Sequence, residues 1–181
     1  MNIIKTEIAD LYIIEPEVFG DGRGWFMETW SRRSMEAAGL FYDFVQDNQS
    51  FSAKKGTLRG LHYQRGDASQ AKLVRCQRGA VLDVAVDLRS ASPTFRRWVQ
   101  VELSADNKRQ FLIPRGFAHG FLSLTDDVEF MYRTDNYYAP KMEAAIIWND
   151  PVIGVEWGIS DPVLSEKDRQ APAFGDGTPL F

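Results

Sequence analysis

The protein has 181 residues, of which 44% are apolar and 25% are charged, which is the composition of an ordinary globular chain that can form one domain with a substantial core. The net charge of −4 and the lack of a basic run argue against a general nucleic-acid surface. No apolar run approaches membrane length and no apolar signal core follows Met1, so we expect no membrane association and a cytoplasmic location. A single domain over residues 1–181 is expected, with residues 175–181 as a flexible tail.

The N-terminal quarter predicts a few short elements. Residues 3–14 alternate well enough to form one or two strands, and residues 15–24 contain enough glycine and proline to predict a loop. Residues 25–30 follow as a strand. Ser31 is then expected to cap a short helix that ends at Gly39, where a left-handed residue is favoured.

From residue 44 onward, strand patterns follow one another and are separated by turn residues at short spacing. The expected strands are residues 44–50, 56–64, 72–78, 80–88, 97–103, 110–113, 116–124, 128–134 and 145–148. Many short strands without intervening helices exclude a βαβ fold and predict an all-β protein, an antiparallel sandwich or barrel with a few short peripheral helices. One such helix is expected to start at Ser165.

The strand over residues 80–88 has the clearest alternation. From residue 82 onward, Leu82, Val84, Val86 and Leu88 alternate with Asp83, Ala85 and Asp87. This pattern predicts an apolar face on one side and two carboxylates on the other.

One of the only two histidines, His62, lies in the strand-like run Gly56–Gln64 beside Arg59. An imidazole can take and return a proton near neutral pH, and a guanidinium offers a planar fork for carboxylate or phosphate. The structural alternative is a half-buried strand histidine that is satisfied by a backbone carbonyl. Strict alternation puts Arg59 and His62 on opposite faces, unless Gly60 hosts a bulge.

A small all-β barrel with a histidine in a central strand resembles a cupin, and many cupins hold a metal through three histidines and a glutamate. Here Gln64 stands where a second histidine would follow His62. The turn at residues 114–116 presents His119, which matches the second cupin half. Two imidazoles cannot build the metal site, so we expect no metal.

With no metal, no Gly-rich phosphate loop and no dinucleotide fingerprint, the chemistry open to an enzyme of this sequence is proton transfer by side chains without a cofactor. Cys76 lies in a strand pattern and is expected to be a small buried hydrophobe. Asp168 is a candidate partner for a histidine base, and Tyr132 is a candidate acid. Asp168 is equally a capping-box residue and Tyr132 equally a core aromatic.

Seven motifs in order along nearly the whole chain resemble the dTDP-4-dehydrorhamnose 3,5-epimerase family. They are residues 19–24, 56–64, 71–75, 83–89, 113–121, 148–151 and 164–168. The resemblance implies a metal-free cupin jelly roll, usually a homodimer, that acts on dTDP-4-dehydro-6-deoxy-D-glucose and inverts C3 and C5.

The same resemblance implies the catalytic roles. His62 would remove a proton, Asp168 would hydrogen-bond to that histidine, and Tyr132 would donate a proton from the opposite face of the sugar. Lys72 would lie near the developing enolate oxygen, where a fixed cation stabilises charge that appears only during the reaction.

The remaining site residues expected from the resemblance bind the nucleotide and sugar. Arg23 and Arg59 would hold the diphosphate, and Tyr138 would stack on thymine. The others contact the base or sugar or complete the family set: Glu28, Asp47, Asn48, Gln49, His119, Glu143 and Lys167. For each of these residues the alternative is a solvated surface group or a core aromatic.

Two other functions stay open from the sequence. A single-centre 3- or 5-epimerase would use the same base and acid, and a non-catalytic cupin would bind a sugar nucleotide without exchanging its protons with solvent. Locating deuterium in the sugar after incubation in D2O would separate all three.

Overall fold

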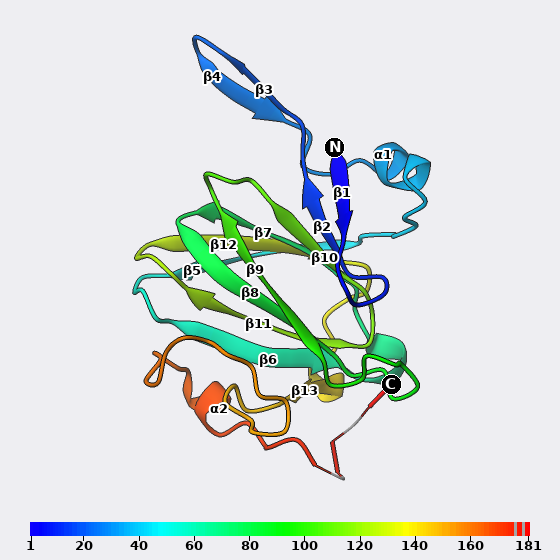
Figure 1. The fold of residues 1–181 in the computed structure, drawn as a ribbon, viewed down its shortest axis with the longest axis vertical. Coiled ribbons are helices and arrows are strands. Elements are labelled where there is room, and N and C mark those ends of the chain that lie inside the picture. The colour runs from blue at the N-terminus through cyan, green and yellow to red at the C-terminus, as the bar shows by residue number, and fades with distance from the viewer. Residues whose placement is uncertain (176, 179) are drawn as a thin grey trace.

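Two antiparallel sheets pack face to face in the computed structural model, which describes residues 1–175, 177, 178, 180 and 181 (Figure 1). The six-stranded sheet contains, in spatial order, β1 (Asn2–Lys5), β2 (Tyr12–Glu15), β10 (Gln110–Ile113), β7 (Lys72–Arg78), β12 (Val128–Thr134) and β5 (Gln46–Ser52). The five-stranded sheet contains β13 (Glu143–Ala145), β6 (Leu58–Gln64), β11 (Phe117–Ser123), β8 (Ala80–Asp87) and β9 (Trp98–Ser104). This arrangement confirms the predicted cupin-type jelly-roll barrel.

The helices are short and peripheral, as expected. They are α1 (Arg32–Ala37), α2 (Glu166–Arg169) and two 3-10 turns, η1 (Gly66–Ala68) and η2 (Pro140–Met142). The Ser31 hydroxyl accepts a hydrogen bond from the Ser34 amide at the start of α1, and Gly39 has a φ of +79° just beyond its end. Both features confirm the predicted limits of this helix.

The core between the sheets is made by inward-facing residues of both. Phe111 and Phe130 of the six-stranded sheet pack there with Val81, Leu103 and Phe121 of the five-stranded sheet. Phe121 and Phe130 stack with their ring centroids 4.2 Å apart. Such aromatic contact fixes the two walls relative to each other at one end of the barrel interior.

The outer face of the five-stranded sheet is also buried, because the C-terminal segment covers it. Val84 and Val86 of β8 pack there against Ile146, Ile153 and Trp157. The predicted alternation in β8 is therefore present, but both of its faces are buried. A strand covered on both sides has no solvent face on which to place its carboxylates.

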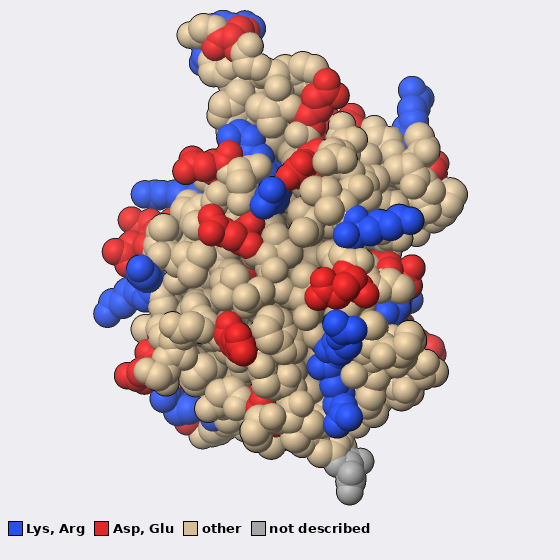
Figure 2. Space-filling view, viewed as in Figure 1, with Lys and Arg blue, Asp and Glu red and all other residues tan. Residues whose placement is uncertain are grey.

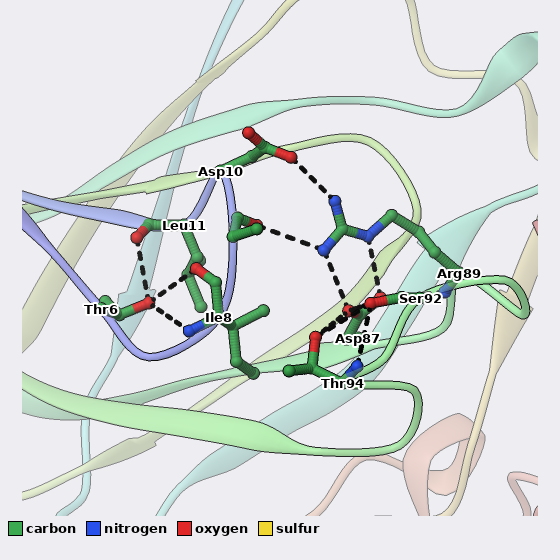
Figure 3. Close-up of polar contacts among 9 residues, drawn as sticks. Thr6, Ile8, Asp10, Leu11, Asp87, Arg89, Ser92 and Thr94 are labelled. Carbon is green, nitrogen blue, oxygen red and sulfur yellow. Dashed lines mark hydrogen bonds and ion pairs between the residues drawn. The ribbon is translucent and has the colours of Figure 1, made fainter.

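Asp87 consequently lies buried at the end of β8, where three side chains donate hydrogen bonds to it (Figure 3). Arg89 makes two hydrogen bonds of 2.9 Å to its carboxylate, and Ser92 and Thr94 donate to the same group. Burial opposes ionisation, but these hydrogen bonds outweigh it and lower the pKa of Asp87. Arg89 also bonds to Asp10, which ties the loop after β8 to the turn between β1 and β2.

The predicted loop over residues 15–24 is wrong in part. It contains β3 (Val18–Asp21), which pairs with β4 (Gly24–Met27) in a hairpin that projects from the barrel (Figure 1). Phe19, Trp25 and Phe26 are exposed on this hairpin, and Phe26 keeps 70% of its surface in solvent. The glycines at 20, 22 and 24 thus shape a hairpin and its turn.

The C-terminal elements differ from expectation in two places. The predicted strand 145–148 is displaced, because the pairing with β6 covers residues 143–145. Phe181, which falls in the predicted flexible tail, contacts Tyr63, and its carbonyl accepts a 2.7 Å hydrogen bond from the Ser90 hydroxyl. Asp176 and Pro179 of that expected tail lie outside the described residues.

The surface carries charges of both signs. On the face shown in Figure 2, lysine and arginine side chains alternate with aspartates and glutamates, and neither sign forms a continuous field. Within the described part of the chain, none of the helices has the length and apolar character needed to span a bilayer.

A bulge in β6 resolves the conflict between Arg59 and His62. His62 is aligned with His119 of β11, and Arg59 is aligned with Phe121, so Gly60 and Leu61 together lie opposite Gly120. The extra residue turns Arg59 and His62 to the same face, which decides between the two arrangements that the sequence left open. The two backbones are so close that a Cβ on Gly60 would lie 2.6 Å from the Gly120 Cα.

We expect Gly60→Ala to lower the free energy of unfolding by about 2 kcal/mol or more, because the added methyl meets backbone atoms and the residue has a φ of +138°. Chemical denaturation measures this. Gly22→Ala is the control, since a Cβ there meets nothing within 4 Å, and its effect should stay within about 0.5 kcal/mol. Equal stability of the two variants would contradict the close-approach argument.

Candidate active site

A cavity of about 330 Å³ lies between the two sheets. It is lined by nine of the predicted site residues, which come from both sheets and from the C-terminal segment: Arg59, His62, Lys72, His119, Tyr132, Tyr138, Glu143, Lys167 and Asp168. Four sequence motifs that are far apart in the chain, residues 56–64, 71–75, 113–121 and 164–168, therefore meet at one place.

His62 and Asp168 form a hydrogen-bonded pair at the edge of this cavity. The His62 Nε2 lies 2.5 Å from Oδ1 of Asp168, which is 3% exposed. Ser165 caps α2 through the Asp168 amide, and its hydroxyl donates to the other carboxylate oxygen at 2.7 Å. Asp168 is thus both the capping-box residue and the histidine partner, and the cap fixes the carboxylate in place.

The hydrogen bond between the two side chains fixes the charge state of Asp168 and the tautomer of His62. Burial works against the Asp168 carboxylate, but the hydrogen bonds from His62 and Ser165 prevail and lower its pKa. An ionised Asp168 accepts the Nε2 proton of His62, which leaves Nδ1 as the basic nitrogen. The ring can therefore accept a proton while the carboxylate stabilises the resulting cation.

Tyr132 lies on the opposite wall of the cavity. It belongs to β12 of the six-stranded sheet, whereas His62 belongs to β6 of the five-stranded sheet. Burial raises the pKa of Tyr132 above its usual value of about 10, so the phenol stays protonated at neutral pH. A base and an acid thus face the same space from two sides.

Three charged or titratable side chains, those of Lys72, Asp83 and His119, lie close together deeper in the cavity wall. The His119 Nε2 lies 2.9 and 3.0 Å from the two oxygens of Asp83, and both residues are buried. Burial lowers the pKa of Lys72 to about 8, although Asp83 and Glu143 oppose this shift. Burial also lowers the pKa of His119 and raises that of Asp83. Lys72 is accordingly a desolvated cation below pH 8.

Asp83 is a site residue that the sequence prediction missed. The signal was present, because Asp83 alternates with valines in the strand over residues 80–88 and so had to share a face with Ala85. The inward direction of that face could not be read, since both faces of β8 are apolar or buried.

The cavity mouth holds a second polar cluster. The Tyr138 hydroxyl donates to Glu143 at 2.9 Å, and the Lys167 ammonium lies 2.6 Å from the same carboxylate oxygen. Burial opposes ionisation of Glu143, but these contacts lower its pKa overall. Arg59 is fixed nearby through hydrogen bonds to the Phe51 carbonyl and the Ser52 hydroxyl.

Five predicted binding residues do not line this cavity. Arg23 is at the tip of the β3–β4 hairpin, where it pairs with Asp21 and keeps 91% of its side chain exposed. Glu28 accepts a hydrogen bond from Ser34 beside α1. These two residues are held on the N-terminal arm, away from the barrel interior (Figure 1).

The other three residues are consecutive on β5, and consecutive strand residues cannot share a face. Asn48 is aligned with Tyr132 and points toward the barrel interior. Asp47 and Gln49 point to the outer face, where Asp47 pairs with Arg133 and Gln49 donates to Glu129.

Among the described residues, no three histidine, cysteine, aspartate or glutamate side chains form a group that could hold a metal ion. His62 and His119 are aligned across β6 and β11, but each directs its Nε2 to a carboxylate of its own. Cys76 is buried, and burial raises the pKa of its thiol to about 11.

An antiparallel barrel with a histidine–aspartate pair facing a phenol, next to a desolvated ammonium, defines an acid–base isomerase of the cupin class. A model of the family described as dTDP-4-dehydrorhamnose 3,5-epimerase matches residues 5–176. The chain belongs to this family of epimerases.

Individual relatives agree with this assignment. The dTDP-4-dehydrorhamnose 3,5-epimerase of Shigella flexneri is 55% identical over 177 residues, which cover 97% of each chain. The crystal structure of the Bacillus anthracis enzyme with TDP and pyrophosphate bound has a TM-score of 0.94 at 44% identity, covering 96% of this chain and 99% of that one. The Legionella pneumophila enzyme in complex with dTDP-4-keto-L-rhamnose has a TM-score of 0.89 at 49% identity, covering 95% and 92%.

A solved structure with a different specificity is also similar. A 3′-monoepimerase from Streptomyces bikiniensis, in complex with dTDP-quinovose, has a TM-score of 0.86 at 37% identity and covers 93% of this chain and 85% of that one. The fold therefore serves single-centre as well as double-centre epimerases.

The Lys72 ammonium should set an alkaline limit to turnover near pH 8, because its cationic form is present below its pKa and lost above it. Asp83→Asn removes a negative charge that raises this pKa, so the limit should move to lower pH and kcat at pH 8 should fall about fivefold. A pH profile of kcat measures both. An unchanged pH profile in Asp83→Asn would contradict the electrostatic coupling of Asp83 to Lys72. Deprotonation of Tyr132 would not produce a limit near pH 8, because the pKa of Tyr132 is raised above its usual value.

Proposed function

We propose that the protein converts dTDP-4-dehydro-6-deoxy-D-glucose into dTDP-4-dehydro-L-rhamnose by inverting C3 and C5. The observation that carries this proposal is the placement of the His62–Asp168 pair and Tyr132 on opposite walls of one cavity. Inversion at a carbon requires removal of a proton from one side and its return from the other, and these two walls supply the two groups.

The ketone at C4 acidifies the hydrogens on both neighbouring carbons, so the same base can serve both steps. His62 takes the proton, and the electron pair of the broken C–H bond moves into an enolate whose oxygen becomes negative. The Lys72 ammonium stabilises that oxygen. Tyr132 then protonates the carbon from the other face. Before the second centre reacts, Tyr132 takes up a proton from solvent and His62 releases to solvent the proton that it removed.

The nucleotide would bind at the cavity mouth. Tyr138 is available there as a half-exposed aromatic for the thymine, Arg59 faces the cavity as a cation for the diphosphate, and Lys167 adds a second positive charge. Glu143 adds a carboxylate at the mouth, and His119 is the polar group that would meet the ligand deeper in the cavity. The free Cys76 thiol fits a reducing compartment, and we place the protein in the cytoplasm.

We also infer that the protein works as a homodimer. Arg23 and Glu28 lie on an arm that does not reach the cavity of its own chain, and the same arm exposes Phe19, Trp25 and Phe26. Exposed aromatics grouped on a projecting hairpin are typical of a surface that another chain covers. If a second copy of the chain bound this hairpin at the mouth of its cavity, Arg23 of the hairpin would join that copy's site.

In D2O, the wild-type protein should introduce deuterium at both C3 and C5 of the 4-keto sugar nucleotide, as located by NMR. His62→Ala should abolish exchange at both carbons, because one base serves both, while its dTDP affinity stays within about twofold since the base is separate from the diphosphate contacts.

Deuterium at C3 alone, or at C5 alone, would identify a single-centre epimerase. Nucleotide binding without any exchange by the wild-type protein would identify a non-catalytic binding protein. Retained exchange in His62→Ala would remove that residue from the mechanism.

A mixing experiment tests the dimer. Arg23→Ala and His62→Ala should each be nearly inactive alone, but mixed dimers would contain one site with an intact barrel and an intact partner hairpin. After subunit exchange at equal amounts, about a quarter of wild-type activity should return. No recovery, together with a monomeric mass in light scattering, would overturn the dimer proposal.

A further inference from the structure

The segment that carries Tyr138 is held in place by the side chains of Gln64 and Gln46. Residues 135–142 connect β12 of the six-stranded sheet to β13 of the five-stranded sheet and so cross the end of the cavity. Tyr138 is 53% exposed in the middle of this crossing. An exposed aromatic on a connecting segment is free to change its position unless its backbone is fixed.

Two glutamine side chains fix three consecutive residues of the segment. The Gln64 Nε2 donates to the Tyr137 carbonyl at 3.1 Å, and the Gln64 Oε1 accepts from the Ala139 amide at 2.6 Å. Between them, the Tyr138 amide donates to the Oε1 of Gln46 at 3.1 Å. Gln64 comes from β6 and Gln46 from β5, so the segment is held from both sheets.

The Gln64 amide is fully used in this arrangement. Its second N–H donates to the Ala68 carbonyl at 2.7 Å, and the residue is 5% exposed. Because a buried amide with three good hydrogen bonds has one favoured orientation, Gln64 transmits the rigidity of β6 to the Tyr138 backbone. The phenol end of Tyr138 is fixed separately by Glu143.

We infer that Gln64, assisted by Gln46, is a positioning residue that holds the Tyr138 ring ready for the nucleotide base. Gln64 occupies the strand position at which a metal-binding cupin would carry its second histidine, and here that position serves ligand recognition. The inference rests on the proposed function of Tyr138.

The expected contribution is bounded by what Tyr138 itself contributes. An aromatic ring that stacks on a base adds about 1–3 kcal/mol of affinity, and a preorganised ring avoids the entropy cost of being ordered on binding. Gln64 acts only through Tyr138, so the loss of the amide cannot exceed the loss of the ring.

Gln64→Glu keeps the shape and the acceptor but loses both donors, and Gln64→Met loses all three hydrogen bonds. Each should weaken dTDP binding about fivefold in calorimetry, with kcat at saturating substrate changed by less than twofold. In the Tyr138→Ala background, Gln64→Met should weaken binding no further. Gln46→Met should show a smaller loss of the same kind.

Asn107→Ala is the matched control, because the Asn107 amide also joins three backbone groups, at Ser104, Arg109 and Glu102, in the turn after β9. It should lower the melting temperature without changing dTDP affinity. Additive losses in the double variant, or a Gln64→Met protein that loses stability but binds dTDP like the wild type, would overturn the inference.

The binding assay keeps this test separate from the proposed function, which the deuterium experiment decides without any Gln64 variant. If Tyr138→Ala binds dTDP as tightly as the wild type while Gln64→Met does not, Gln64 acts otherwise than through Tyr138 and the inference is wrong.

Discussion

The close approach of Gly60 and Gly120 is the constraint on which the site depends. Neither residue has room for a side chain, since a Cβ on Gly120 would lie 2.8 Å from the Arg59 carbonyl. This contact accommodates an extra residue in β6, and the extra residue turns Arg59 and His62 to the same side. Without the extra residue, the His62 imidazole and the Arg59 guanidinium would lie on opposite faces of β6, and only one of them could line the cavity.

The two-sheet architecture supplies the second requirement, which is separation. If the base and the acid stood on the same face of one strand, both would approach the substrate from the same side. The proton would then return to the face that it left, and the carbon would not be inverted. His62 and Tyr132 belong to different sheets, and the aromatic core near Phe121 and Phe130 keeps those sheets at a fixed spacing. The third requirement is that each group has the right protonation state. Burial raises the pKa of Tyr132, which keeps the phenol protonated, and lowers the pKa of Lys72 to about 8.

Strand periodicity predicted most of the barrel, because strands buried on at least one face must alternate or stay apolar. The limits of β7, β10 and β12 agree with the prediction residue for residue. The predicted strand over residues 25–30 corresponds in part to β4, but its partner β3 was missed for a physical reason. The hairpin does not pair with the barrel, so its aromatics need not follow an inside–outside pattern, and the glycines of β3 and the turn are typical of loops.

The candidate site was predictable only in part for similar reasons. The chain has only two histidines, and each of them, like Lys72, lies within one of the family motifs, so these three residues could be assigned to the site from the sequence. The run at residues 47–49 was assigned as a unit, although alternation sends Asp47 and Gln49 to the outer face. Asp83 was missed because the sequence does not reveal which of two buried faces encloses a cavity. The roles of Gln46 and Gln64 depend on a connecting segment whose path no local pattern encodes.

The C-terminal segment that covers the five-stranded sheet also carries α2, and with it the carboxylate that orients His62 across 106 positions of the chain. The base is therefore oriented only when the C-terminal segment is in place on the sheet. A chain that ended before residue 165 would keep the strands of His62 and Tyr132 but would lack the carboxylate that fixes the imidazole.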